Sequence, residues 1–391
     1  MPRASKLAHI ALMIDAGTRD ETDGEEGLAH FIEHAIFKGT SKRKAYHILS
    51  ALDRVGGELN AYTSKEDTCF HASFLNQYFS RAADIISDIA FQPSFPAKDV
   101  EKEKDVIIDE IQSYNDNPGE LIFDAFEENI FKDHPLGRSV LGTEESVRKL
   151  TVDQAKGFMA KQYGVNKMVI CTAGSLSLSK MKSTLERYFG DYNQISEKRK
   201  KVDLGIHNGS FTVKEDRDTH QAHTILGAKA YNITEPKKLP LSLLNNYLGG
   251  PGLNSILNLE IRERNGIAYN IESSYQPFTD NGYWQVYLGT DTNQLEKSMK
   301  LVRGILKRMR TKKLGVLQLH LAKKQYLGQM ALSQESALNS MMALGKSLLL
   351  FDKIESDEVF YNRIKSISDS DILEVANEIF VDENLSTLIY Y

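Results

Sequence analysis

The chain has 391 residues, more than one ordinary hydrophobic core contains, so we expect two domains. Hydrophobic residues make up 41% and charged residues 26% of the sequence, and the net charge of -5 excludes the strongly basic surface of a nucleic-acid-binding protein. No apolar run approaches the ~20 residues of a transmembrane helix, and Cys69 and Cys171 provide no disulfide framework. We therefore expect a cytoplasmic protein with no membrane span and no nucleic-acid partner.

The predicted elements of the first half mix short strands with longer helices. Apolar runs predict strands over residues 10–16 and 69–75. Amphipathic spacing predicts helices over residues 25–37, 44–55, 78–91 and 97–114. In the second half, strands are expected over residues 209–214, 223–230, 268–275 and 282–290.

A polar stretch over residues 191–208 carries the basic run KRKK and is the best candidate for a linker. Residues 150–171, before this stretch, and residues 367–391, after it, share one sequence pattern. Each begins with an N-cap signal, continues as an amphipathic helix that ends at an aromatic residue, and finishes in a β-rich segment. We therefore predict an N-terminal domain over residues 1–190 and a similar domain over residues 209–391. Because strands and helices do not alternate strictly, the fold class is α+β, with each domain a mainly antiparallel sheet covered by helices.

The segment GLAHFIEHAIFKGT, residues 27–40, places three titratable side chains in an apolar context. The spacing of Thr22 to Glu25 is that of a capping box, and Gly39 suits a helix end. The nearby acidic cluster Glu21, Asp23, Glu25 and Glu26 is interpreted as a solvated helix start.

On a helical wheel, the apolar residues of this segment gather on one face, and His30, Glu33 and His34 gather on the other. Two histidines at i and i+4 can bind one metal ion, and the carboxylate beside them can reach a water at that ion. The alternative is a pair of core-edge histidines satisfied by hydrogen bonds. The HxxEH spacing favours the metal interpretation.

Such a site needs a third protein ligand, and the acidic helix expected over residues 97–114 is the best source. Glu101 and Asp105 are expected on its solvated face. Glu103 and Glu110 are seven residues apart, so they share one face and can both point into one pocket. The spacing leaves open which carboxylate binds the metal.

Six stretches of the chain resemble the inverzincin metallopeptidases, the family of pitrilysin, insulin-degrading enzyme and the mitochondrial processing peptidases. They are DAGTRDE (15–21), GLAHFIEHAIFKGT (27–40), GGELNAYTSKEDT (56–68), EKDVIIDEIQ (103–112), HPLGRSVLGTEESV (134–147) and IRERNGIAY (261–269). They occur in the family's order and span both halves. The length resembles that of the half-size branch, whose subunits pair to close a chamber.

This resemblance implies a role for each matching residue. His30, His34 and Glu110 would bind one Zn²⁺ per chain, Glu33 would be the general base, and Glu103 would assist near the metal. Asn60, Ala61 and Tyr62 would belong to the edge strand that binds the substrate peptide. Arg262 and Tyr269 would contact substrate and help to polarise the scissile carbonyl. Without the resemblance, they are an ordinary surface arginine and a core-edge tyrosine.

The other histidines are interpreted as structural. His71 lies in an expected strand and His134 precedes a proline, while His220 and His223 have no carboxylate at metal-binding spacing. The second half has no HxxEH copy, so one metal per chain is expected.

The leading hypothesis is a zinc-dependent endopeptidase that cleaves peptides or unfolded segments inside a chamber closed by dimerisation. The partner is a second copy of the chain or a related subunit. Two alternatives remain at this point. One is a noncatalytic core or assembly subunit of the same fold, and the other is an HxxEH metal enzyme that acts on a small metabolite.

Overall fold

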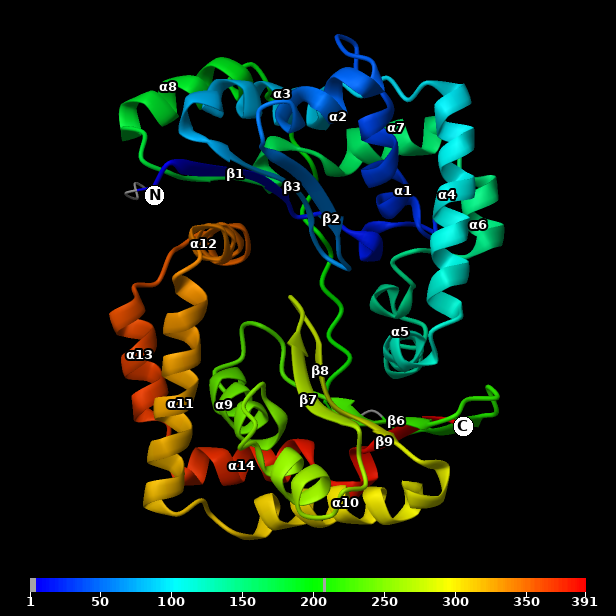
Figure 1. Ribbon diagram of the computed structural model, residues 1–391, viewed down its shortest axis with the longest axis vertical. Coiled ribbons are helices and arrows are strands. Elements are labelled where there is room, and N and C mark those ends of the chain that lie inside the picture. The colour runs from blue at the N-terminus through cyan, green and yellow to red at the C-terminus, as the bar shows by residue number, and fades with distance from the viewer. Residues whose placement is uncertain (1–4, 207–208) are drawn as a thin grey trace. The chain divides into compact units, whose positions relative to one another are not determined.

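The computed structural model describes residues 5–206 and 209–391, which form two compact units (Figure 1). Unit 1 comprises Met1–Ser113, His134–Arg199 and Leu332–Ile354. Unit 2 comprises Tyr114–Asp133, Lys200–Ala331 and Glu355–Tyr391. Each unit thus includes a segment from the opposite half of the sequence. The predicted domain limits at residues 190 and 209 stay a prediction, and residues 207–208 of the predicted linker lie outside the described residues.

Unit 1 is built on a four-stranded sheet with the order β2-β3-β1-β4, in which every neighbouring pair is antiparallel. Its strands are β1 (Leu7–Ile14), β2 (Glu58–Thr63), β3 (Thr68–Leu75) and β4 (Met168–Ala173). Its helices are α1 (Leu28–Ala35), α2 (Ala45–Asp53), α3 (Phe79–Phe91), most of α4 (Ala97–Asn115), α6 (Glu144–Lys149), α7 (Val152–Gln162), α8 (Leu178–Phe189) and α12 (Ala337–Phe351).

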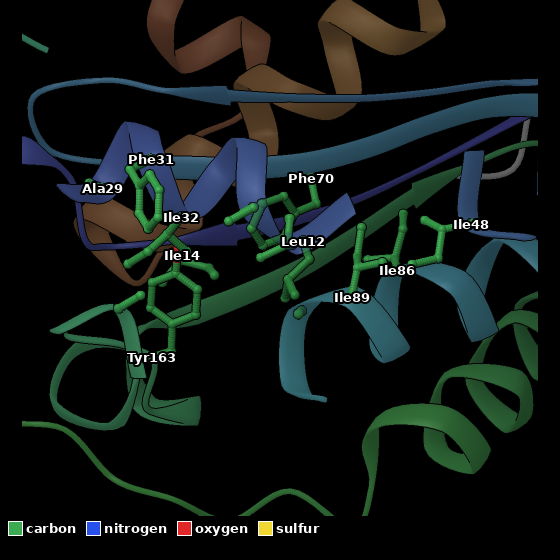
Figure 2. Close-up of a cluster of buried hydrophobic side chains, with 14 of the residues drawn as sticks. Leu12, Ile14, Ala29, Phe31, Ile32, Ile48, Phe70, Ile86, Ile89 and Tyr163 are labelled. Atoms are coloured by element: carbon green, nitrogen blue, oxygen red, sulfur yellow. The ribbon is translucent and has the colours of Figure 1, made fainter. Parts of the chain in front are cut away.

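One face of this sheet forms the main core of unit 1. Leu12 of β1 is aligned with Phe70 of β3, and both side chains are fully buried. Helix α3 contributes Ile86 and Ile89 to the same cluster, and α1 contributes Ile32 (Figure 2). Burial of each such side chain contributes about 1.5–3 kcal/mol. The core therefore fixes the position of α1 against the sheet.

The opposite face of the same sheet is covered by α12, which packs against β1 and β4. Met13 and Cys171 lie beneath this helix. A Cβ atom added at Gly345 would lie 2.7 Å from the Cys171 sulfur, so the helix can approach the sheet this closely because residue 345 has no side chain. Both faces of the sheet are thus buried within unit 1.

Unit 2 has a five-stranded sheet with the order β5-β9-β6-β8-β7. Its strands are β5 (Thr212–Glu215), β6 (Ala222–Lys229), β7 (Asn270–Pro277), β8 (Gly282–Thr290) and β9 (Ser386–Tyr390). Its helices are α5 (Pro118–Ile130), α9 (Lys238–Gly249), the π-helix η6 (Asn258–Glu263), α10 (Leu295–Thr311), most of α11 (Val316–Gln334), α13 (Asp357–Ser366) and α14 (Asp369–Ile379). Only β5 and β9 pair in parallel among the described strands.

The interior strand β8 is buried at all nine positions, as expected for a strand covered on both faces. Trp284 belongs to the main core of the unit, and its ring centroid lies 4.4 Å from that of Phe380. Tyr287 lies on the opposite face, where its ring is 5.0 Å from Phe123 of α5. Helix α5 therefore covers the second face of this sheet.

The two sheets have the same topology. The series β2-β3-β1-β4 of unit 1 corresponds to β7-β8-β6-β9 of unit 2, where β5 is an additional strand. The predicted shared pattern is also present: Thr151 caps α7 and Ser368 caps α14, each through a capping box. An aromatic C-cap residue, Tyr163 or Phe380, follows each helix, and the strands β4 and β9 come next. The predicted α+β fold class, with two similar and mainly antiparallel units, is confirmed.

Arg199, where the second segment of unit 1 ends, belongs to an ion-pair network. Its guanidinium donates to both carboxylate oxygens of Asp20 at 2.8 and 2.7 Å and lies 2.8 Å from Asp15. It also donates to the Glu66 carbonyl. This network fixes the middle of the predicted linker to the segment that precedes α1.

No helix among the described residues is long and apolar enough to cross a lipid bilayer.

Candidate metal centre

Helix α1 carries the HxxEH residues, and its start differs from the prediction. The helix begins at Leu28 rather than at residue 25, because Gly27 has φ 85°, a left-handed conformation. A Cβ atom at Gly27 would also lie 2.6 Å from the carbonyl oxygen of Leu141. The expected box at Thr22 exists as a local turn, in which the Thr22 backbone N–H donates to the Glu25 carboxylate at 2.8 Å. It does not begin the helix.

The carboxylate of Glu21 caps α1 instead. It accepts hydrogen bonds from the backbone N–H groups of Gly27 at 3.1 Å and Ala29 at 2.8 Å. Glu21 is only 4% exposed, so the interpretation of all four acidic residues as a solvated cluster is wrong at this position. Burial raises the pKa of Glu21 to about 8, against the opposing effect of the two N–H donors. This cap holds the first turn of α1 in place.

Three potential metal ligands converge at the polar face of α1. His30 Nε2 lies 3.8 Å and His34 Nε2 lies 3.6 Å from Glu110 Oε2. One ligand atom from each residue lies within 4.8 Å of the others. Two imidazoles and one carboxylate are a donor set of catalytic zinc sites, in which Zn–N and Zn–O bonds are about 2.0–2.2 Å long. The residues present therefore fit a zinc ion.

Glu103 occupies a different position from Glu110, although both lie on α4 and face His34. Its Oε1 lies 3.0 Å from His34 Nδ1, and its Oε2 lies 2.5 Å from Lys38 Nζ. Burial would raise the pKa of Glu103, but its hydrogen bonds with His34 and Lys38 outweigh this effect and lower the pKa. A carboxylate that accepts the Nδ1 proton of a histidine leaves Nε2 free to bind a metal. The spacing left open which of the two glutamates binds the metal. In the structure Glu103 contacts Nδ1 of His34, whereas Glu110 lies near Nε2.

His30 has no such carboxylate. No hydrogen-bond partner of its buried Nδ1 is found within residues 5–206 and 209–391. Burial, and secondarily the neighbouring His34, lowers the pKa of His30 to about 4. The imidazole is therefore neutral at pH 7, which is the form that binds a metal.

Glu33 lies next to the donor set on the same face of α1. Burial raises its pKa, while the nearby Thr63 hydroxyl opposes the shift and Glu110 adds to it. A carboxylate with a raised pKa is better suited to accept and return a proton near neutral pH. Glu33 can therefore serve as an acid–base group beside the donors.

Strand β2 lies at the edge of the unit 1 sheet and contains Asn60, Ala61 and Tyr62. Ala61 packs against the core, whereas the Tyr62 hydroxyl donates to Asp67 Oδ2 at 3.2 Å. Among the described residues, β3 is the only strand that pairs with β2. The other edge of β2 thus has no described strand paired with it.

Arg262 and Tyr269 belong to unit 2, whereas the donor set belongs to unit 1. Arg262 lies in the π-helix η6 and is exposed. Tyr269 precedes β7, is 59% exposed, and donates a hydrogen bond to Asp291 Oδ1 at 3.1 Å. Short π-helical segments occur often at functional sites.

Two of the other histidines, His134 and His223, make structural contacts. His134 Nδ1 accepts a hydrogen bond from the Leu136 N–H at 3.1 Å, and His223 Nδ1 lies 2.8 Å from the Tyr287 hydroxyl. Sequence reasoning missed Glu21, Lys38 and Thr63. Lys38 lies four residues after His34, a helical spacing that hinted at a shared face. Glu21 and Thr63 reach α1 only through loops and the sheet.

The fold and the donor set together define the class: two α+β units of one topology, with a His–His–Glu group in the first unit. Two family models match the chain, one described as "Insulinase (Peptidase family M16)" over residues 3–144 and one as "Peptidase M16 inactive domain" over residues 149–326. The chain belongs to peptidase family M16, which is confirmed by near full-length relatives and agrees with the resemblance in the sequence.

Among these relatives, the uncharacterized zinc protease YmxG of Bacillus subtilis (strain 168) is 32% identical over 380 residues, covering 97% of this chain and 92% of the relative. An uncharacterized zinc protease of Rickettsia bellii (strain RML369-C) is 31% identical over 389 residues, covering 100% and 93%.

Two solved structures share the fold. A protease from Helicobacter pylori superposes with a TM-score of 0.93 at 20% identity, covering 100% of this chain and 95% of that one. A peptidase M16 inactive domain protein from Pseudomonas fluorescens superposes with a TM-score of 0.91 at 19% identity, covering 99% and 93%.

Proposed function

We propose that this protein is a zinc-dependent endopeptidase that hydrolyses peptides or unfolded protein segments. The observation that supports this most is the convergence of His30, His34 and Glu110, with Glu33 beside them, in a chain whose relatives are named zinc proteases. The function is assigned to unit 1, since it contains all four residues.

His30, His34 and Glu110 would hold the zinc ion, one per chain. Bound there, zinc supplies a Lewis acid that polarises the scissile carbonyl and makes water a nucleophile near neutral pH. Glu103 does not act as a ligand in this proposal. It holds the His34 imidazole by its Nδ1 atom and so presents Nε2 to the metal.

Glu33 is the general base. Its carboxylate takes a proton from the attacking water and later delivers that proton to the nitrogen of the leaving amine. The raised pKa of Glu33 brings it closer to the pH at which both steps are efficient. The substrate peptide pairs with the free edge of β2, where Asn60, Ala61 and Tyr62 provide backbone groups with little demand on sequence.

Arg262 and Tyr269 contact the substrate and donate hydrogen bonds to the oxygen that gains negative charge. The enzyme works as a dimer that closes a chamber, and in this arrangement the two residues serve the zinc site of the partner chain. A mixture of Glu33→Gln chains and Arg262→Ala chains tests this directly. Recovered activity supports action in trans, and a completely inactive mixture contradicts it.

The mechanism itself is tested with Glu33→Gln. The purified variant is expected to retain one zinc per chain and to lose about 10²–10⁴-fold in peptide cleavage, the range for a general base. Glu101→Gln is the matched control, because this carboxylate is 68% exposed on α4 and is expected to leave cleavage unchanged. Absence of stoichiometric zinc from the wild type, or full activity of Glu33→Gln, would show that the proposal is wrong.

A further inference from the structure

Basic and acidic residues are distributed unevenly along the chain. Acidic residues outnumber basic ones overall, 53 to 48, but residues 297–331 contain ten Lys and Arg residues and no Asp or Glu. This stretch forms most of α10 and α11, which belong to unit 2, and the turn between them (Figure 1). A local excess of this size attracts anionic partners, although the net charge of the whole chain is -5.

Most of these positive charges are not neutralised within the protein. Carboxylates lie within 4.0 Å of four of them, Arg303, Arg308, Arg310 and Lys313. In the part of the chain that the structure describes, no ion pair is found for the other six, Lys297, Lys300, Lys307, Lys312, Lys323 and Lys324. Five of these six lysines are exposed, so their charges face solvent.

Helix α11 carries apolar residues on two opposite faces. Its inner face packs Ala322 and Tyr326 against the main core of unit 2. Its outer face places Leu317 and Leu321, which are 68% and 52% exposed, one turn apart. Val316, at the start of the helix, is 91% exposed. Aliphatic side chains that are grouped and exposed in this way mark an interaction surface.

The basic and the apolar residues meet at the start of α11. Lys312 lies in the turn before the helix, and Lys324 lies three residues after Leu321 on the same face. We call this group, which has no acidic member, the docking surface. It consists of Lys312, Val316, Leu317, Leu321 and Lys324.

A hollow of about 770 Å³ opens beside the docking surface, and Val316 and Lys324 are among the residues that line it. Its apolar walls are formed by Leu314, Leu319, Leu327 and Ile367. Lys323 also lines the hollow, where its Nζ donates a hydrogen bond to the Lys365 carbonyl at 2.7 Å. Apolar walls with a few ammonium groups suit a ligand that is apolar at one end and anionic at the other.

The side chains beside the lysines distinguish between possible anionic partners. Proteins that bind single-stranded nucleic acids use aromatic side chains that stack on the bases, and the docking surface has no aromatic member. Leucine and valine instead insert among acyl chains, while neighbouring lysines contact anionic headgroups. We propose that the docking surface binds the protein reversibly to an anionic lipid bilayer, without spanning it. This interaction goes beyond the peptidase function and does not depend on it.

Sedimentation of the full chain with lipid vesicles tests the proposal. Binding to vesicles of phosphatidylcholine mixed equally with phosphatidylglycerol is expected to be about tenfold or more tighter than binding to phosphatidylcholine alone, and to weaken at high salt. Equal binding to both kinds of vesicle, or to neither, overturns the proposal. Glu33→Gln should bind vesicles as the wild type does, which separates this surface from the peptidase function.

Two double variants separate the contribution of charge from that of apolar contact. Lys312→Gln/Lys324→Gln should weaken binding by about fivefold per lysine and reduce its salt dependence. Leu317→Gln/Leu321→Gln should weaken binding by about tenfold and leave the salt dependence unchanged. Wild-type affinity in either variant overturns the proposal.

The matched control is Leu178→Gln/Lys182→Gln on α8. It changes the same residue types at positions of similar exposure, 70% for Leu178 and 74% for the side chain of Lys182. This control should bind anionic vesicles as the wild type does. An equal loss in the control and in the docking-surface variants would show that binding is not localised at α11, and would overturn the proposal.

Fluorescence reports insertion into the bilayer directly. The only tryptophan of the chain, Trp284, is fully buried, so Leu317→Trp adds one exposed indole. Its emission should shift to shorter wavelength on anionic vesicles, whereas Leu178→Trp should show no shift. Absence of a shift for Leu317→Trp overturns the proposal. Binding of duplex DNA or polyglutamate that equals vesicle binding, and that Leu317→Gln/Leu321→Gln leaves unchanged, would also overturn it and assign the lysines to a dissolved polyanion.

Discussion

Replacement of Glu103 by alanine tests whether this residue positions a metal ligand rather than binding the metal. The side chain is 10% exposed and holds His34 Nδ1 at 3.0 Å, so its removal frees the imidazole to rotate and leaves Lys38 without its partner. Loss of such a carboxylate typically costs 10–100-fold in metal affinity, which corresponds to about 1.4–2.7 kcal/mol. A true ligand would cost more, and Glu110→Ala provides that comparison.

The assay is a zinc competition titration against a chromogenic chelator at fixed pH. Lys38→Met should weaken zinc binding less than Glu103→Ala, because the acceptor for His34 remains while its charge partner is lost. The double variant should match Glu103→Ala alone, since Lys38 reaches His34 only through Glu103. Additive losses in the double variant, or zinc affinity of Glu103→Ala within twofold of the wild type, would refute this reasoning.

The remaining predictions concern stability, measured by chemical denaturation. Arg199→Met leaves the buried Asp20 carboxylate and the partly buried Asp15 carboxylate without their paired cation and should cost about 3–5 kcal/mol, whereas Lys198→Met, at an exposed position, should change little. Gly345→Val forces atoms into the contact between α12 and Cys171 and should destabilise unit 1 by about 1–3 kcal/mol, and an unchanged midpoint would argue against this packing. Burial raises the pKa of Glu21 from 4.5 to about 8, so the folded state holds this proton more tightly than the unfolded chain does. Stability from this group is present below pH 4.5 and is lost as the pH rises through 8, by at most about 1.4 kcal/mol per pH unit. Glu21→Gln should remove this component of the pH dependence, and parallel curves for both proteins would contradict the assignment.

Local periodicity was sufficient for the elements with strong patterns. The helix predicted over residues 97–114 is α4, Ala97–Asn115, and the strand predicted over residues 282–290 is β8. The seven-residue spacing of Glu103 and Glu110 correctly placed both on one face toward His34. These results depend only on the geometry of a single element.

Periodicity did not predict that each unit contains a helix from the opposite half of the sequence. Helix α12 covers the sheet of unit 1 and α5 covers the sheet of unit 2, although each comes from the opposite half of the chain. An amphipathic pattern shows that a helix buries one face, but not which sheet it covers. The start of α1 was missed for a different reason: Gly27 adopts a left-handed conformation, and the capping carboxylate belongs to Glu21, six residues before Gly27 and outside the capping-box spacing.

By itself, the sequence determined the α+β class, the repeated unit and the face of α1 that carries His30, Glu33 and His34, because these follow from periodicity within contiguous segments. Only the tertiary structure decided which atom of His34 each of the two glutamates, Glu103 and Glu110, contacts. One of them meets Nδ1 and the other Nε2 of His34, a difference of a few ångströms set by the packing of α4 against α1. Sequence spacing defines directions along one helix, whereas distances between helices arise from the side chains packed between them.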